Sequence, residues 1–156
     1  MTKYAADLAG RLHRAGLMMA TAESCTGGWV AKVLTDIAGS SEWFDCSFVT
    51  YSNQAKQSML GVRAETLEMH GAVSEAVVRE MVAGALARSR ADLALSISGI
   101  AGPGGGSPEK PVGTVWFAWQ RAGMEAVTAC HRFDGDRDAV RHQAVVVAMR
   151  GALALL

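Results

Sequence analysis

The sequence has no excess of charge of either sign. Its 15 lysine and arginine residues balance 15 aspartate and glutamate residues, so the formal net charge at pH 7 is zero. A protein that binds nucleic acid needs a broad basic surface to neutralise the phosphates of its partner. We therefore expect no nucleic-acid partner.

Long hydrophobic runs are also missing, although 50% of the residues are hydrophobic. Glycine, aspartate and arginine interrupt every apolar segment well before the ~20 residues that a membrane-spanning helix needs. The N-terminal residues Met1–Asp7 show no signal-peptide pattern. We expect no membrane partner and a cytoplasmic location.

Cysteine is scarce, and its spacing excludes two further classes of protein. Cys25, Cys46 and Cys130 are odd in number, far apart and without a C-x-x-C pair. They indicate neither a disulfide framework nor a zinc site, and they suit a reducing compartment. The histidines and carboxylates show no ligand spacing either, so we expect no metal and no other cofactor.

The chain is long enough for one domain with a sizeable core, and we expect a single domain over residues 1–156. Strands separated by helices indicate an α/β fold, and a turn at 122–123 pairs the last two strands as a hairpin. The sheet is therefore expected to be mixed, in a three-layer α/β/α arrangement with helices on both faces. The predicted strands are 17–22, 48–51, 93–98, 114–119 and 126–133.

The stretch Ala20–Gly28 is predicted to be the end of the first strand turning into a helix, since a helical apolar pattern starts at Trp29. This prediction places Ser24 near a helix N-terminus. There, unpaired backbone N–H groups and the helix dipole stabilise a developing oxyanion. A simpler role for Ser24 or Thr26 is to cap the helix.

Lys56 is a second candidate, on a short helix predicted at Asn53–Leu60. It follows a strand that is able to lie beside the strand before Ser24. A desolvated lysine with a lowered pKa can accept a serine proton, whereas most helical lysines are solvated surface residues. No local S-x-x-K spacing is present, so this pair depends on the fold.

The loop Ser98–Thr114 holds six glycines and all three prolines of the chain. It lacks the Gly-Lys-Ser/Thr of a phosphate-binding P-loop and leads into a strand, so it fits no dinucleotide motif. Unstructured loops of this length are usually functional, although a plain connection between strands is the alternative. Arg137 and Arg141, one helical turn apart, suit a phosphate or carboxylate, or else form local pairs with aspartates.

Two other nucleophile systems have weaker support. Cys25 adjoins Ser24, but no motif assigns it a histidine partner. His142 and Asp138 lie one helical turn apart and would complete a serine triad, yet no G-x-S-x-G elbow is present.

Six blocks of the sequence, in this order, resemble the CinA C-terminal domain family. They are T-A-E-S-C-T-G-G at 21–28, V-T-Y-S-N-Q-A-K at 49–56, G-A-V-S-E at 71–75, S-I-S-G-I-A-G-P at 96–103, K-P-V-G-T-V-W at 110–116 and G-D-R-D-A-V-R at 135–141. The resemblance spans almost the whole chain and implies a three-layer α/β fold without a metal. Stand-alone members are nicotinamide-nucleotide amidases. They hydrolyse the carboxamide of nicotinamide mononucleotide to nicotinate mononucleotide and ammonia, in pyridine-nucleotide salvage.

The resemblance implies a role for each candidate residue. Ser24 is expected to attack the carboxamide carbon, and Lys56 to act as base and then as acid for the departing ammonia. Backbone N–H groups at the helix start are expected to hold the oxyanion. Tyr51 is expected to relay a proton or to pack on the pyridinium ring. The expected substrate-binding residues are Thr26, Gly27, Gly102, Gly104, Gly105, Arg137 and Arg141.

A second function stays open, namely a non-catalytic nucleotide- or partner-binding module of the same fold. Family members also occur as domains appended to longer proteins, and the activity of such domains need not survive. The amino-terminal domain of those longer proteins is not expected here. The presence of both Ser24 and Lys56 favours the enzyme, with a small-molecule substrate, and we expect a homo-oligomer.

Overall fold

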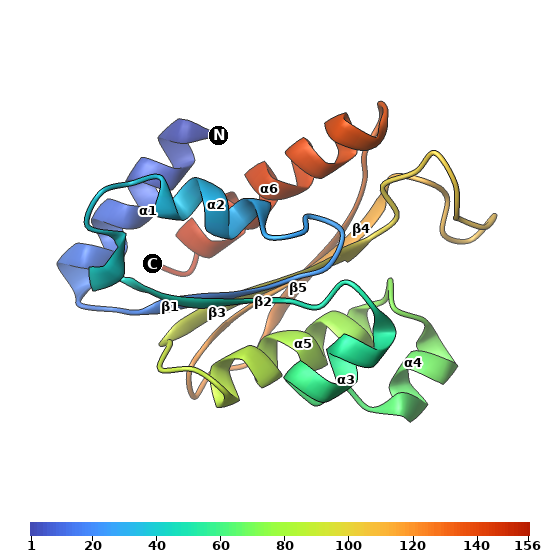
Figure 1. Cartoon of the computed structure of the whole chain (residues 1–156), viewed down its shortest axis with the longest axis horizontal. Coiled ribbons are helices and arrows are strands. Elements are labelled where there is room, and N and C mark those ends of the chain that lie inside the picture. Colours follow the sequence, from blue (N-terminus) through green and yellow to red (C-terminus); the bar gives the residue numbers. More distant parts are fainter.

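A computed structural model describes residues 1–156 as a five-stranded sheet between two layers of helices (Figure 1). The strand order is β2-β1-β3-β4-β5, in which β2, β1 and β3 are parallel, β4 is antiparallel to β3, and β5 is antiparallel to β4. The predicted three-layer α/β/α fold with a mixed sheet is confirmed. The strands are β1 (Met19–Glu23), β2 (Phe44–Val49), β3 (Leu93–Gly99), β4 (Thr114–Arg121) and β5 (Val127–Arg132).

Three helices cover each face of the sheet. In Figure 1, α1, α2 and α6 lie above the sheet, and α3, α4 and α5 lie below it. None of them is both long enough and apolar enough to cross a membrane. The helices are α1 (Thr2–Ala15), α2 (Trp29–Thr35), α3 (Asn53–Leu60), α4 (Ala64–His70), α5 (Glu75–Ala87) and α6 (Arg137–Leu153), with a short 3-10 helix η1 (Ser40–Glu42) before β2.

Each face of the sheet has its own hydrophobic core, and the central strand β3 contributes to both. Leu95 and Ile97 belong to the larger core under α1, α2 and α6, whereas Ala94 belongs to the smaller core against α5. Because β3 is buried on both faces, its sequence is a nearly continuous apolar run. Alternate residues of β1 and β3 therefore face opposite helix layers, which decides where their last side chains lie.

The helix after Ser24 begins at Trp29, where the helical apolar pattern of the sequence starts, and Gly27 and Gly28, with φ of 59° and 95°, keep the chain in turns before it. The bounds predicted for the second strand are wrong. The second strand was predicted at 48–51 but runs over Phe44–Val49. It ends early because the chain turns there into α3.

Helix α3 has the predicted bounds. The Ser52 hydroxyl accepts a hydrogen bond from the Ala55 N–H at 3.0 Å, and Gly61 ends the helix with φ of 72°. Since β2 runs parallel to β1, the start of α3 and the loop after β1 meet at the same edge of the sheet. Lys56 is thereby brought beside the residue that follows β1.

Gly84 is required for the contact between α5 and the end of α3. A methyl group at this position would collide with the carbonyl group of Leu60, which is backbone and cannot move aside. We expect Gly84→Ala to lower the free energy of unfolding by about 1–3 kcal/mol. Gly10→Ala in α1 is the matched control, because its new methyl group would meet only the flexible end of Arg14. Urea denaturation measures both, and equal effects would contradict this account.

Candidate active site

A cavity of about 310 Å³ opens at the edge where β1 and β3 end. Ser24 enters it from the loop after β1, Lys56 from α3, and Ser98 from the end of β3. In Figure 1 the glycine-rich loop between β3 and β4, drawn in yellow, extends past this edge of the sheet. The remaining lining residues are Cys25, Tyr51, Asn53, Ala72, Val73, Gly99, Ile100, Ala101, Gly102, Gly104 and Arg137.

Ser24 and Lys56 are in direct contact. The Lys56 Nζ lies 2.9 Å from the Ser24 Oγ, and both residues are buried, with exposed fractions of 1% and 7% for Lys56 and Ser24. Nζ also donates to the carbonyl oxygens of Thr50 at 2.8 Å and Tyr51 at 3.4 Å. Lys56 makes no salt bridge with a carboxylate, so its charge is not compensated by an opposite charge in contact.

Burial lowers the pKa of Lys56 below the ordinary lysine value of 10.5, because a buried ammonium loses its hydration. A thiolate at Cys25 would have the opposite effect on Lys56, but burial raises the pKa of the Cys25 thiol to about 11. The neutral amine has two N–H donors for the two carbonyl oxygens. Its lone pair is then left for the Ser24 hydroxyl, which is the arrangement of a general base and its nucleophile.

The competing nucleophile systems receive no support from this geometry. The raised pKa keeps Cys25 protonated at neutral pH, and a thiol is a far weaker nucleophile than a thiolate. His142 packs edge-on against Trp29, with ring centroids 5.9 Å apart, and hydrogen-bonds neither Ser24 nor Asp138. The chain contains no cluster of three or more His, Cys, Asp or Glu residues able to hold a metal.

Glu23, which was not predicted as a functional residue, anchors the loop that carries Ser24. Its buried carboxylate accepts hydrogen bonds from the Thr26 hydroxyl at 2.8 Å and from the N–H groups of Val30 and Ala31, both at 3.0 Å. The N–H groups of Val30 and Ala31 are thus already bonded, whereas those of Cys25 and Thr26 donate to no group of the protein. The prediction that backbone N–H groups hold the oxyanion stays a prediction for these two. The only hint in the sequence is one acidic residue ending an otherwise uncharged strand.

Thr26 and Gly27 make hydrogen bonds within the loop after β1, which carries Ser24. Thr26 is fully buried and donates to Glu23, while the Gly27 N–H donates to the Ser24 carbonyl oxygen at 3.0 Å. Neither residue lines the cavity. In the structure they shape the turn after Ser24, and their contact with substrate stays a prediction.

Arg141 holds the same loop from the other helix layer. Its Nε donates to the Cys25 carbonyl oxygen at 2.9 Å and its Nη2 to that of Thr26 at 3.3 Å. Its guanidinium also lies over the Trp29 ring, 5.5 Å from the centroid. It forms no salt bridge with the aspartates at the start of α6, so the alternative of local Asp–Arg pairs is not observed.

Arg137 connects Tyr51 with the glycine-rich loop. Its Nη1 donates to the Gly102 carbonyl oxygen at 2.8 Å and its Nη2 to the Tyr51 hydroxyl at 3.0 Å. Tyr51 is 61% exposed and lies at the rim of the cavity. Of the three predicted loop glycines, Gly102 and Gly104 line the cavity, whereas Gly105 is exposed and does not.

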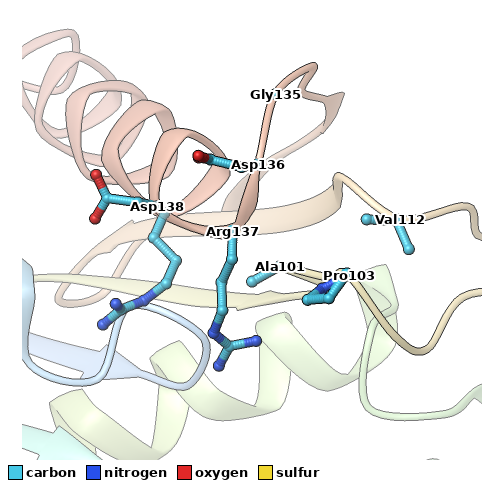
Figure 2. Close-up of a pocket in the computed structure, with 8 residues that line it drawn as sticks. Ala101, Pro103, Val112, Gly135, Asp136, Arg137 and Asp138 are labelled. Carbon is cyan, nitrogen blue, oxygen red and sulfur yellow. The ribbon is translucent and has the colours of Figure 1, made fainter.

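A second cavity of about 490 Å³ adjoins the first and shares Ala101 and Arg137 with it. Figure 2 shows the side chain of Arg137 extending from the start of α6 past Ala101 and Pro103. Val112, Asp136 and Asp138 also line this space. The two cavities together offer room for a ligand larger than the group that reaches Ser24.

Comparison with known proteins identifies close relatives. The family model described as the CinA C-terminal domain matches residues 1–156. The chain is 66% identical to nicotinamide-nucleotide amidohydrolase PncC of Escherichia coli over 139 residues, which cover 89% of this chain and 84% of that protein. It is 49% identical to the protein of the same name in Pseudomonas putida, over 99% of this chain and 96% of the relative.

Solved structures show the same fold. The crystal structure of competence/damage inducible protein CihA from Agrobacterium tumefaciens matches with a TM-score of 0.96 and 46% identity, over 99% of this chain and 94% of that one. A CinA superfamily protein from Klebsiella pneumoniae matches with a TM-score of 0.94 and 46% identity, over 99% and 98% of the two chains. This chain therefore belongs to the CinA C-terminal domain family.

Proposed function

We propose that this protein is an amidase that hydrolyses the carboxamide of nicotinamide mononucleotide to nicotinate mononucleotide and ammonia. The names of its relatives support the substrate and the reaction. The observation that carries the mechanism is the buried contact of 2.9 Å between the Lys56 Nζ and the Ser24 Oγ. A nucleophile in contact with a desolvated amine is the arrangement that serine-lysine hydrolases use.

The proposed reaction has two halves. The Ser24 Oγ attacks the carboxamide carbon while its proton passes to the Lys56 Nζ. Collapse of the tetrahedral intermediate breaks the carbon–nitrogen bond, and the proton on Lys56 goes to the leaving nitrogen, which departs as ammonia. A water molecule then attacks the Ser24 ester and gives its proton to Lys56. Ser24 leaves with that proton, and the carboxylate product is released.

The rest of the nucleotide is assigned to the rim and the second cavity. Tyr51 is positioned at the rim by Arg137, and we assign it to packing against the pyridinium ring. We assign the phosphate to Arg137, whose guanidinium uses only two of its five N–H groups in the protein and borders both cavities. Arg141 also lines the second cavity but not the first, and it is assigned to the loop after β1 because both of its hydrogen bonds go to carbonyl oxygens of that loop.

Removal of Arg137 is expected to weaken recognition of the phosphate. Arg137→Ala should raise KM for nicotinamide mononucleotide at least ten-fold and change KM for the dephosphorylated riboside much less, because the lost contact is to phosphate. Arg150→Ala, at the exposed far end of the same helix, is the control. If Arg137→Ala keeps the full wild-type preference for the phosphorylated substrate, the phosphate assignment is wrong.

The proposed function is tested by incubating the purified protein with nicotinamide mononucleotide. We expect one ammonia and one nicotinate mononucleotide for each substrate consumed. The competing function, a binding module, predicts that calorimetry detects nucleotide binding while no ammonia appears. That result would replace the enzyme with the module.

A further inference from the structure

A serine nucleophile that attacks an amide needs hydrogen-bond donors for the negative oxygen that develops in the transition state. Several N–H groups around this turn are already used, since the Ser24 N–H donates to the Ile97 carbonyl oxygen at 3.0 Å and those of Val30 and Ala31 donate to Glu23. The N–H groups of Cys25 and Thr26 donate to no group of the protein, and a side-chain donor in the cavity wall would act beside them.

Ser98 has the properties of such a donor. It is only 1% exposed as a whole residue, yet it lines the cavity, and no side-chain hydrogen bond to another residue uses its hydroxyl. Ser96, on the same face of β3, behaves differently, because its hydroxyl donates to the Val78 carbonyl oxygen at 2.7 Å. A hydroxyl that lines a cavity and has no partner in the protein is free to donate a hydrogen bond to a ligand there.

The sheet register places Ser98 beside Ser24. Ala22 pairs with Ser96, and both face the α5 layer. Ser98 lies two residues further along β3 and faces the same way. Ser24 directly follows β1, its N–H still donates to the Ile97 carbonyl oxygen of β3 at 3.0 Å, and both serines line the cavity. Neighbouring strands lie about 4.8 Å apart. A carboxamide carbon about 3.3 Å from the Ser24 Oγ would hold its oxygen within reach of a hydroxyl on that neighbouring strand.

Lys56 and Ser98 lie on opposite sides of Ser24, because β1 is flanked by β2 on one side and β3 on the other. Lys56 follows β2 in the chain and contacts Ser24 from there. In the proposed reaction the leaving nitrogen must face Lys56 to receive its proton, so the carbonyl oxygen is turned towards β3. We propose that the Ser98 hydroxyl donates a hydrogen bond to the carbonyl oxygen of the scissile carboxamide and stabilises the oxyanion.

The experiment measures kcat and KM for ammonia release from nicotinamide mononucleotide, and it rests on the proposed function. Ser98→Ala is expected to lower kcat about 10²- to 10³-fold with KM nearly unchanged, as for loss of an oxyanion donor. Ser98→Thr keeps the hydroxyl and should recover most of the rate. Ser98→Cys, similar in size but a weak donor, should stay slow. Ser96→Ala is the control and should keep the wild-type kcat.

The pH dependence of kcat/KM separates this role from an indirect one. The rate of Ser98→Ala should rise with pH over the same range as that of the wild type, since Lys56 is untouched. A displaced profile would mean that Ser98 acts through Lys56, which contradicts the inference. A wild-type kcat in Ser98→Ala, or a raised KM alone, would also contradict it, and the N–H groups of Cys25 and Thr26 would then hold the oxyanion. A wild type that releases no ammonia overturns the proposed function instead.

Discussion

Replacing Ser24 by alanine is expected to abolish ammonia release from nicotinamide mononucleotide while leaving the fold intact. In the serine hydrolase subtilisin, loss of the serine nucleophile lowers kcat on the order of 10⁶-fold. The loop should survive because Glu23 and Arg141 hold it, and the only partner of the Ser24 hydroxyl within the protein is Lys56. We expect the free energy of unfolding to change by about 1 kcal/mol.

Steady-state ammonia release and urea denaturation of Ser24→Ala check these two expectations. A variant that is folded and retains near wild-type turnover would rule out the serine mechanism. Cys25 would then be the next nucleophile to test, by Cys25→Ala, although burial raises its pKa to about 11.

Lys56→Arg is expected to be nearly as inactive as Lys56→Ala, with turnover lowered at least 10³-fold. A guanidinium keeps its positive charge but does not give up its proton in a protein, so it is unable to act as a base. In the wild type, only enzyme with the neutral Lys56 amine is competent. The ratio kcat/KM should therefore rise with pH through the pKa of Lys56, at a midpoint below the ordinary lysine value of 10.5 because burial lowers that pKa.

The control for this substitution is Lys32→Arg, on the exposed face of α2, which should leave both rate and pH profile unchanged. The measurement is kcat/KM for the wild type and for Lys56→Arg, Lys56→Ala and Lys32→Arg between pH 6 and about 10. An active Lys56→Arg enzyme would reduce Lys56 to an electrostatic role. A wild-type rate that does not change with pH would argue against a titrating base.

The fold could be predicted from local signals because those signals agree with one another. Helix α3 has a serine cap, a glycine stop and the expected bounds in the structure. The exception is the second strand, which was predicted at 48–51 and runs over Phe44–Val49. The aromatic and β-branched residues at 48–51 favour a strand, but the chain turns there into α3.

The candidate site could be predicted only in part, since its contacts join residues far apart in the chain. Pairing Ser24 with Lys56 requires β1 and β2 to be parallel neighbours. The hydrogen bonds from α2 to Glu23 and from Arg141 to the loop depend on how α2 and α6 pack. No spacing of residues in the sequence indicates that packing. The expected homo-oligomer and the cytoplasmic location stay predictions, to be checked by sedimentation and cell fractionation.

The central claim is that the reaction passes through an ester on Ser24, and hydroxylamine tests it most directly. Hydroxylamine competes with water for an acyl-enzyme and converts it to a hydroxamate. During turnover of nicotinamide mononucleotide by the wild type, we expect the nucleotide hydroxamate to increase with hydroxylamine concentration at the expense of nicotinate mononucleotide, with one ammonia released per product. If nicotinate mononucleotide stays the only product at every concentration while ammonia is still released, water attacks the carboxamide directly and the ester does not exist.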